Sequence, residues 1–378
     1  MTTLMIIIRC PPSLVLLLFL FLFSRFECSV SILTCSDITE AQSCIDNTEL
    51  GVHPCVWCTI DRQCHDVGSL EDPCGDDCCA SKAGASACKW STPNVSYPDG
   101  HCTKGGLPTN TTEFSETLAA EMVWFAGAAY CDPTLIQKWD CGEPCEKNPS
   151  MNVTSVHQND EDKVFGFVGY DATLEAIVVS FRGTDPADIQ NWALNLDAIQ
   201  EKPYKDMPTV AVHSGFYKAY QVLKGGVMVS VNTLAGEVGA GKGLLLTGHS
   251  LGASMASLLA LDLVREYGFK NVTVMHFGSP RTGNYNFHFA MTQHVKNVWR
   301  VTHADDLVAH VPTEFMGYYH ISNEIYFPAK IFDGKYVVCN HSGEDPSCSN
   351  SCSDKMACVS IEDHLHYLGV PLSRSCKA

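Results

Sequence analysis

The pentapeptide Gly248-His-Ser-Leu-Gly252 holds a serine between two glycines, in the pattern G-x-S-x-G. Small residues two positions before and after the serine let a strand and a helix approach closely, so that a sharp turn can hold the serine in a strained conformation. A strand-like apolar run, Leu244 to Leu246, precedes the motif, and a helix-forming run follows it. This context favours a nucleophile elbow at Ser250 over a strand–turn–helix junction with an idle serine.

An unactivated serine is a poor nucleophile, so it needs a histidine that is oriented by a carboxylate. In one common order of this triad, the carboxylate and then the histidine follow the serine along the chain. Two neighbouring acids, Asp305 and Asp306, come directly after a β-rich run, and two histidines, His364 and His366, lie near the C-terminus. The spacing alone favours neither acid over the other and neither histidine over the other.

Acyl transfer also needs two preorganised N–H donors for the oxyanion of its tetrahedral intermediate. The residue after the nucleophile, Leu251, is expected to supply one donor. The second is expected at the end of an earlier strand, where the candidate is the tetrapeptide Phe181-Arg-Gly-Thr184. Taken alone, that tetrapeptide is equally typical of an ordinary strand-to-loop turn.

The elements that must position these side chains alternate between helix-like and strand-like runs from residue 114 onward. Apolar spacing predicts helices over 117–129, 216–234 and 251 to about 266, although Gly225-Gly226 weakens the second. Strands are predicted over 164–169, 174–181, 244–246, 272–277 and 298–301. Strands separated by helices predict an α/β fold with a central, mixed but mostly parallel sheet that is covered on both faces.

Composition limits the class of protein. The 378 residues include 25 basic and 42 acidic side chains, which gives a net charge of −17, and 20 cysteines. The acidic excess, without any Lys/Arg cluster, argues against a nucleic-acid partner. Apolar residues make up 46% of the chain, enough for a sizeable core. The cysteines are typical of a disulfide framework in an oxidising compartment.

Residues 1–28 have the features of a secretory signal peptide. Arg9 precedes the apolar run 14–23, which is too short to span a bilayer and ends at Ser24-Arg25. A signal anchor that includes residues 4–8 is the rival interpretation, and Arg9 and the two prolines after it disfavour that reading. On a secretory route, five sequons would be open to glycosylation, at Asn94, Asn110, Asn152, Asn271 and Asn340.

The cysteines divide the remaining chain into two parts. Ten fall in residues 29–104, which we interpret as a small disulfide-rich module with too little apolar sequence for a core of its own. Its stretch around Cys55-Val-Trp-Cys58 loosely resembles plexin–semaphorin–integrin type modules, and a zinc site of Cys55 and Cys58 with Cys78 and Cys79 is the alternative. A linker, 105–113, leads to residues 114–378, which we expect to form the catalytic domain.

Further motifs surround the elbow in a fixed order. They are Phe181-Arg-Gly-Thr184 with Asn191-Trp192, Val212-His-Ser-Gly-Phe216, Phe277-Gly-Ser-Pro-Arg281, Arg300-Val301, Asp306-Leu-Val-Ala-His310-Val-Pro312 and Asp363-His-Leu-His-Tyr367. Together with the elbow, these motifs resemble those of the fungal-type class 3 lipase family, across roughly residues 114–376. The family has an α/β-hydrolase fold, and its members act on triacylglycerols, phospholipids or feruloyl esters.

The resemblance gives individual residues a role. It implies Ser250 as nucleophile, Asp306 as acid and His364 as base. It implies the backbone N–H groups of Thr184 and Leu251 as the oxyanion hole. It also implies disulfides, which are Cys131–Cys376, Cys141–Cys145 and pairs among Cys339, Cys348, Cys352 and Cys358.

Family members cover the site with a lid between the oxyanion strand and the next helix. In this chain that segment is 185–194, and its large apolar side chains are Ile189, Trp192 and Leu194. The segment also carries Asp185 and Asp188, which make it more polar than the lids of interfacially activated members. The lid therefore leaves open whether the substrate is a lipid or a soluble ester.

We expect a secreted, extracellular serine ester hydrolase, and first of all a triacylglycerol lipase that forms an acyl-enzyme on Ser250. It would act on lipid or other carboxylic esters with transient contact to a lipid interface, and would need no metal or organic cofactor. Alternatives within this class are a feruloyl or other soluble-ester esterase and a phospholipase A1. The alternative from another class is a secreted adhesion or interaction protein with an idle hydrolase scaffold, against which the complete Ser/Asp/His order argues.

Overall fold

The chain divides into two compact units, Met1–Gly106 and Leu107–Ala378. The computed structural model describes four short strands of the first unit (5–9, 29–33, 55–58 and 63–66) and residues 113–239, 241–351, 358–372 and 374–377 of the second. The predicted apolar run 14–23, the sequons at Asn94 and Asn110, and most of the predicted cysteine pairing in the module lie outside the described residues.

The described strands of the first unit form two antiparallel pairs. Strand β1 (Met5–Arg9) pairs with β2 (Ser29–Leu33), and β3 (Cys55–Cys58) pairs with β4 (Gln63–Asp66). The Cys-Val-Trp-Cys stretch that carries the loose resemblance to plexin-type modules therefore lies on one strand of a hairpin.

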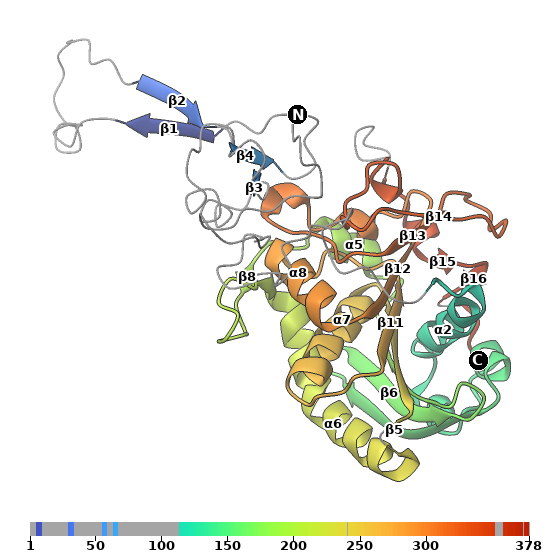
Figure 1. The fold of residues 1–378 in the computed structure, drawn as a ribbon. Helices are drawn as coiled ribbons and strands as arrows, with labels where there is room; N and C mark the ends of the chain where they lie inside the picture. Colours follow the sequence, from blue (N-terminus) through green and yellow to red (C-terminus); the bar gives the residue numbers. More distant parts are fainter. Residues whose placement is uncertain are drawn as a thin grey trace. The chain divides into compact units, whose positions relative to one another are not determined.

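The second unit is built on an eight-stranded sheet in the order β14-β13-β12-β11-β10-β7-β6-β5 (Figure 1). Its five central strands, β7 and β10 to β13, are parallel to one another, and β5, β6 and β14 pair antiparallel at the two sides. The strands are β5 (Met151–Asn159), β6 (Val164–Asp171), β7 (Ala176–Phe181), β10 (Gly243–His249), β11 (Val272–Phe277), β12 (Asn297–His303), β13 (Glu324–Phe327) and β14 (Val337–Val338). Short pairs add β8 (Gln200–Glu201) with β9 (Val212–His213) and β15 (His366–Tyr367) with β16 (Val370–Pro371).

Helices cover both faces of this sheet, and each face has its own apolar cluster. Helices α6, α7 and α8 pack on one face, and α2 and its neighbours pack on the other (Figure 1). The helices are α2 (Glu116–Ala128), α3 (Pro133–Gln137), α4 (Glu143–Lys147), α5 (Ile189–Leu194), α6 (Ser214–Val238), α7 (Leu251–Arg265), α8 (Tyr285–His294) and α9 (Ile361–His364), with 3₁₀ turns η5 (Val308–His310) and η6 (Glu314–Met316). This is the mixed, mostly parallel α/β sheet that the sequence predicts.

The sheet connections determine where the predicted site residues lie. Strands β7, β10, β11 and β12 are neighbours and run in the same direction. Their carboxyl ends therefore meet at one edge, where ligands bind in open α/β sheets. The oxyanion tetrapeptide follows β7, the serine follows β10, Gly278 follows β11, and the two candidate acids follow β12.

Helix α6 crosses Gly225-Gly226 without a break, although paired glycines weaken a helix. A Cβ on Gly226 would come within 2.6 Å of Nδ1 of His157, whereas one on Gly225 would meet nothing within 4 Å. The glycine at 226 thus lets α6 lie directly against strand β5, and packing outweighs the weak helix propensity.

Disulfides join the ends of the hydrolase unit. Cys131 bonds to Cys376 across a sequence separation of 245 residues, and Cys141 bonds to Cys145. Cys339 bonds to Cys348, and Cys358 is also disulfide-bonded. Among the described residues, Glu324, Cys339 and Cys348 lie close enough together to hold a metal, but the two cysteines are bonded to each other.

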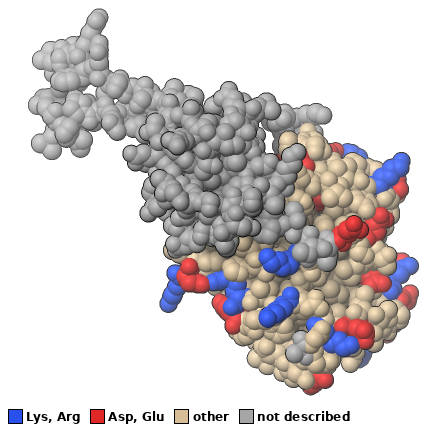
Figure 2. Space-filling view, viewed as in Figure 1, with Lys and Arg blue, Asp and Glu red and all other residues tan. Residues whose placement is uncertain are grey.

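The surface of the described residues carries charges of both signs. On the face in Figure 2, basic and acidic side chains are interspersed over the hydrolase unit. No helix in the described ranges is long and apolar enough to cross a membrane.

Candidate active site

Ser250 lies at the junction between β10 and α7, as the elbow pattern predicts. Its backbone has φ 58° and ψ −129°, a strained conformation for a residue with a side chain. The glycines explain the sequence requirement, because a Cβ on Gly248 would collide with the backbone of Gly252, and one on Gly252 would collide with the carbonyl of Phe181. Ser250 is fully buried, and its Oγ has no hydrogen-bond partner among the described residues.

The structure distinguishes the two candidate acids. Oδ2 of Asp306 lies 2.9 Å from Nδ1 of His364, and both side chains are buried. Asp305 instead pairs at the surface with Lys330, whose Nζ lies 3.0 Å from its Oδ2. Of the two acids, Asp306 is therefore the one that contacts a candidate base.

The two candidate histidines are also distinguished. Nε2 of His364 is buried and has no partner within the described part of the chain, so it is free to exchange a proton. His366 is half-buried, and its Nδ1 lies 3.0 Å from the carbonyl oxygen of Glu362. The geometry therefore brings Asp306 and His364 together and leaves Asp305 and His366 outside the pair.

Further groups fix the Asp306 carboxylate. The Tyr367 hydroxyl donates to Oδ2, and the Val308 backbone N–H donates to Oδ1 at 2.7 Å. Burial by itself would raise the pKa of Asp306, but the charge and hydrogen bond of His364 and the Tyr367 hydroxyl outweigh it and lower the pKa to about 2. The carboxylate consequently stays ionised beside His364 at neutral pH.

Gly278, at the end of β11, provides the space for this pair. Its φ is +56°, and a Cβ there would lie 2.9 Å from Nδ1 of His364 and 3.0 Å from Oδ2 of Asp306. Its backbone N–H donates to the carbonyl of Val301 on the neighbouring strand. Both the backbone conformation and the close approach therefore call for glycine at this position.

The predicted oxyanion donors lie together on one cavity of about 500 Å³. Leu251 is the first residue of α7, where backbone N–H groups have no partner within the helix. Thr184 and Gly183 line the same cavity, with Trp192 and the charged Lys163 and Lys218 among the other lining residues. The cavity is therefore lined both by the residues that carry the candidate N–H donors and by charged side chains.

The predicted lid segment contains the short helix α5. Ile189 is 1% exposed and packs with Ala193 against Val308, and Trp192 lies against the same cluster. Val308 follows the candidate acid by two residues, so α5 covers the loop that carries Asp306. Trp192 also stacks on Phe216 of α6, with ring centroids 6.0 Å apart.

Leu194 departs from the expected lid face. Its side chain is 69% exposed, because the 3.6-residue period of α5 turns position 194 away from the face that carries Ile189 and Ala193. The inward face of the predicted lid segment is therefore made by Ile189, Trp192 and Ala193.

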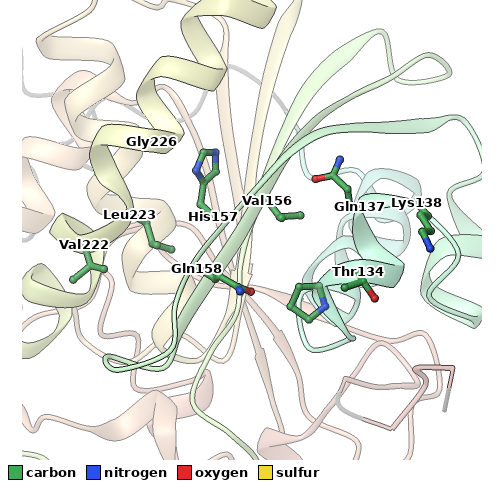
Figure 3. Close-up of a pocket in the computed structure, with 10 residues that line it drawn as sticks. Thr134, Gln137, Lys138, Val156, His157, Gln158, Val222, Leu223 and Gly226 are labelled. Atoms are coloured by element: carbon green, nitrogen blue, oxygen red, sulfur yellow. The ribbon is translucent and has the colours of Figure 1, made fainter.

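A second cavity, of about 650 Å³, lies away from these residues, between α3, β5 and α6 (Figure 3). Thr134, Gln137, Val156, His157 and Leu223 are among the residues that line it, and none of the predicted catalytic or oxyanion residues is among them.

The predicted glycosylation sites within the described residues, Asn152, Asn271 and Asn340, are exposed.

Sequence reasoning missed three contributors to the site. Tyr367 and Gly278 stand inside motifs that were recognised, but their contacts with Asp306 depend on the fold. The pattern G-x-S-x-G assigns no role to His249, which stands at its first variable position, yet Nε2 of His249 lies 2.7 Å from the carbonyl oxygen of His364. The only indication of their role in the sequence was that all three residues stand inside or next to the recognised motifs.

Comparison with known proteins agrees with this geometry. Residues 178–316 match the family model for lipase (class 3). Over 249 residues, 64% of the chain, the sequence is 29% identical to secreted mono- and diacylglycerol lipase 1 of Fusarium solani, of which the match covers 72%. It is 28% identical over 252 residues, 65% of the chain, to a lipase of Rhizopus niveus, of which it covers 61%.

Solved structures extend the likeness to the fold. The lipase of Rhizopus microsporus var. chinensis superposes with a TM-score of 0.63 and 26% identity, over 70% of this chain and 94% of that one. A triacylglycerol lipase whose catalytic centre is described as a serine protease triad superposes with a TM-score of 0.62 and 25% identity, over 70% of this chain and 97% of that one.

The strand order, the elbow and the buried acid–histidine pair define an α/β-hydrolase. The hydrolase unit of this chain is similar to the class 3 lipase family, both in the part that matches the family model and in its fold. The protein is therefore a carboxylic ester hydrolase of the serine type.

Proposed function

We propose that Ser250, Asp306 and His364 are the catalytic triad of a secreted lipase that hydrolyses acylglycerols. The observation that carries the proposal is the buried Asp306–His364 hydrogen bond, together with the two unpartnered atoms that the chemistry needs, Oγ of Ser250 and Nε2 of His364. A buried polar atom without a partner costs stability, so a function is the natural reason to keep two of them in one site.

The chemistry follows from these positions. Oγ of Ser250 attacks the ester carbonyl while Nε2 of His364 takes the hydroxyl proton, and Asp306 holds the imidazole tautomer and stabilises the imidazolium. The N–H groups of Leu251 and Thr184 stabilise the oxyanion. His364 then protonates the departing alcohol, and water repeats the sequence on the acyl-enzyme to release the fatty acid.

An acyl chain can reach the serine only if α5 moves, because Ser250 is fully buried in the closed arrangement. Movement of α5 would separate Ile189, Ala193 and Trp192 from Val308 and expose an apolar surface beside the site. Such a surface is stabilised by contact with lipid and destabilised in water, which supports a substrate that is presented at an interface.

A small apolar patch outside the lid supports the same contact with lipid. It consists of Ile199, Phe315 and Met316, which are 62%, 83% and 48% exposed. Two hydrogen bonds tie its segments together, from Gln200 to the Gly317 carbonyl and from the Tyr318 hydroxyl to the Ile199 carbonyl. We call these three residues the rim patch.

Secretion is supported by several independent features. The signal-peptide pattern, the disulfides of the hydrolase unit and the exposed sequons fit an extracellular protein. Relatives from Fusarium solani and Penicillium cyclopium carry the word secreted in their names.

The names of the relatives, lipase and mono- and diacylglycerol lipase, favour acylglycerols over feruloyl esters or phospholipids as the substrate of this chain.

The test is hydrolysis by the secreted full-length chain. Ser250→Ala should reduce the turnover of tributyrin and of soluble p-nitrophenyl butyrate by at least about 10⁴-fold without loss of secretion. The matched control is Ser254→Ala, one turn along α7, where the hydroxyl is buried and bonded to Thr282. Unchanged turnover in Ser250→Ala would refute the mechanism.

The substrate class is tested separately, with triolein emulsion, monoolein, phosphatidylcholine and methyl ferulate. A lipase should act fastest on the acylglycerols, and Phe315→Ser in the rim patch should slow only the emulsified ones. A higher rate on methyl ferulate or phosphatidylcholine would replace the acylglycerol assignment with the esterase or phospholipase one, and the triad would still stand. An inert protein would favour the scaffold alternative.

A further inference from the structure

His249, the middle residue between Gly248 and Ser250, is buried and uses both ring nitrogens. Nε2 lies 2.7 Å from the backbone carbonyl oxygen of His364, and Nδ1 lies 2.7 Å from the hydroxyl of Tyr130. A carbonyl oxygen can only accept, so Nε2 must carry the proton. Nδ1 is then an acceptor, and the Tyr130 hydroxyl donates to it.

The Tyr130 oxygen also lies against the oxyanion tetrapeptide. A Cβ on Gly183 would collide with that oxygen. The hydrogen bonds form one ordered series, in which the Tyr130 hydroxyl donates to Nδ1 of His249 and Nε2–H of His249 donates to the His364 carbonyl. Two side chains thus connect the turn after β7, the end of β10 and the last residue of α9.

The ring of His249 also lies next to the ring of the candidate base, tilted against it. The ring centroids of His249 and His364 are 4.3 Å apart, at an interplanar angle of 33°. Burial, and then the proximity of His364, hold the pKa of His249 well below its usual value of 6.5. A neutral ring at this distance does not repel the imidazolium that forms on His364 during the reaction, whereas a protonated one would.

We propose that Tyr130 and His249 are positioning residues, which hold the base His364 and the Gly183–Thr184 turn in one fixed geometry relative to Ser250. The proposal rests on the triad assignment, because it concerns how that triad is oriented. Neither side chain exchanges a proton with the substrate. Their effect is on the alignment of the proton acceptor and the oxyanion donor in the transition state.

A purely structural role predicts a different outcome. Both rings would then serve as packing, and loss of the Tyr130 hydroxyl would weaken the fold while leaving each folded molecule fully active. A positioning role predicts that kcat falls in molecules that are still folded, with KM nearly unchanged, because the misalignment affects the transition state more than the bound ester.

The experiment compares Tyr130→Phe with Tyr220→Phe in the full-length protein. Tyr220 is a fully buried tyrosine on α6, its hydroxyl donates to Asp262 at 2.6 Å, and it is not among the residues that line the candidate cavity. Kinetics are measured on p-nitrophenyl butyrate, and the fraction of active molecules is obtained from the end-point of labelling by a fluorophosphonate. We expect Tyr130→Phe to lower kcat per labelled site by about 10- to 100-fold with KM within twofold, and Tyr220→Phe to leave kcat unchanged.

A second pair of variants tests the hydrogen bond to His364. His249→Gln can still donate an amide N–H toward the His364 carbonyl, whereas His249→Phe keeps a ring of similar shape without a donor. We expect the glutamine variant to retain at least about tenfold more kcat than the phenylalanine variant. Equal kcat in the two variants, or wild-type kcat per labelled site in Tyr130→Phe, would overturn the positioning role.

These outcomes are distinct from failure of the triad itself. If Ser250→Ala retains activity or its fluorophosphonate labelling, the triad assignment falls. If Ser250→Ala is inactive and unlabelled while Tyr130→Phe turns over like wild type, only the positioning proposal falls.

Discussion

The hydrolase unit buries two pairs of opposite or potentially opposite charge, and they differ in the basic group that each pair contains. Arg300 on β12 and Glu324 on β13 lie 2.9 Å apart and are 0% and 2% exposed. Asp306 and His364 lie 2.9 Å apart and are 1% and 0% exposed. Depth and separation are therefore almost the same in the two pairs.

The partners around each pair are different. Both oxygens of Glu324 are used, by Arg300 and by the Thr302 hydroxyl, and Arg300 also donates to the Gly343 carbonyl. The Asp306 carboxylate is equally well held, and each pair leaves one buried nitrogen without a partner among the described residues, Nη1 of Arg300 and Nε2 of His364. A permanently charged arginine suits a structural pair, whereas a histidine with one free nitrogen suits proton transfer.

The largest expected effect is on the catalytic pair. Asp306→Asn keeps the shape of the side chain but removes the charge that holds the imidazole tautomer, so kcat should fall by about 10³- to 10⁴-fold. The control is Asp305→Asn, since Asp305 pairs with Lys330 at the surface. Steady-state kinetics on a soluble ester decide the matter, and a larger loss in Asp305→Asn would reverse the acid assignment.

The structural pair should respond in stability and not in chemistry. Glu324→Gln leaves the buried guanidinium of Arg300 without its ion-pair partner, which should reduce the free energy of unfolding by about 3–5 kcal/mol. Urea denaturation measures that loss, while kcat of the molecules that remain folded should stay near wild type. The surface control is Glu175→Gln, beside Lys242, which should barely move the midpoint. A fall in kcat as large as that of Asp306→Asn would mean that the two pairs are not separate in function.

A smaller effect is expected where a glycine makes room for the catalytic pair. Gly278→Ala would put a Cβ 2.9 Å from Nδ1 of His364, so kcat should fall by about 10- to 100-fold as the ring is displaced. Gly268→Ala is the matched control, because Gly268 also has a positive φ, +74°, but nothing within 4 Å of its Cβ position. Both variants carry the same kind of backbone strain, so a loss of kcat in Gly278→Ala alone measures the close contact. Equal kcat in the two would show that the ring is free to move aside.

The sequence predicts the catalytic strands well because their signals are local. The apolar runs that become β6, β7, β10, β11 and β12 are buried on both faces, and short motifs follow at the ends of the last four. A chain with this order of motifs brings the serine, the acid and the oxyanion turn to one edge whatever the details of the loops. The candidate triad could therefore be predicted down to a choice between neighbouring residues.

The parts that were missed depend on partners far along the chain. Strand β5 alternates irregularly between buried and exposed positions, and β13 begins with Glu324, whose burial makes sense only beside Arg300. The contact of Tyr130 with His249 spans 119 residues. No local sequence pattern predicts such a contact, because a tyrosine near the end of a helix is ordinarily a packing residue.

A buried histidine beside the Arg300–Glu324 pair predicts a measurable dependence of stability on pH. His276 on β11 lies opposite Arg300, and neither ring nitrogen has a hydrogen-bond partner within the described ranges. Burial, and then the charge of Arg300, lower the pKa of His276 to about 3 from its ordinary value of 6.5. Between these two values the unfolded chain binds a proton that the folded protein does not. The contribution of His276 to stability is therefore complete above pH 6.5 and is lost as pH falls.

His276→Leu removes this proton uptake with little change in volume. The slope of unfolding free energy against pH, measured by urea denaturation between pH 4 and 6, should become shallower by about 1.4 kcal/mol per pH unit. Asp306→Asn should act in another window, since the pKa of Asp306 is lowered from 3.8 to about 2 and its contribution is lost only below about pH 4. An unchanged slope in His276→Leu would mean that the ring is protonated in the folded protein, and the neighbouring Arg300–Glu324 pair would then have to accommodate a second buried positive charge.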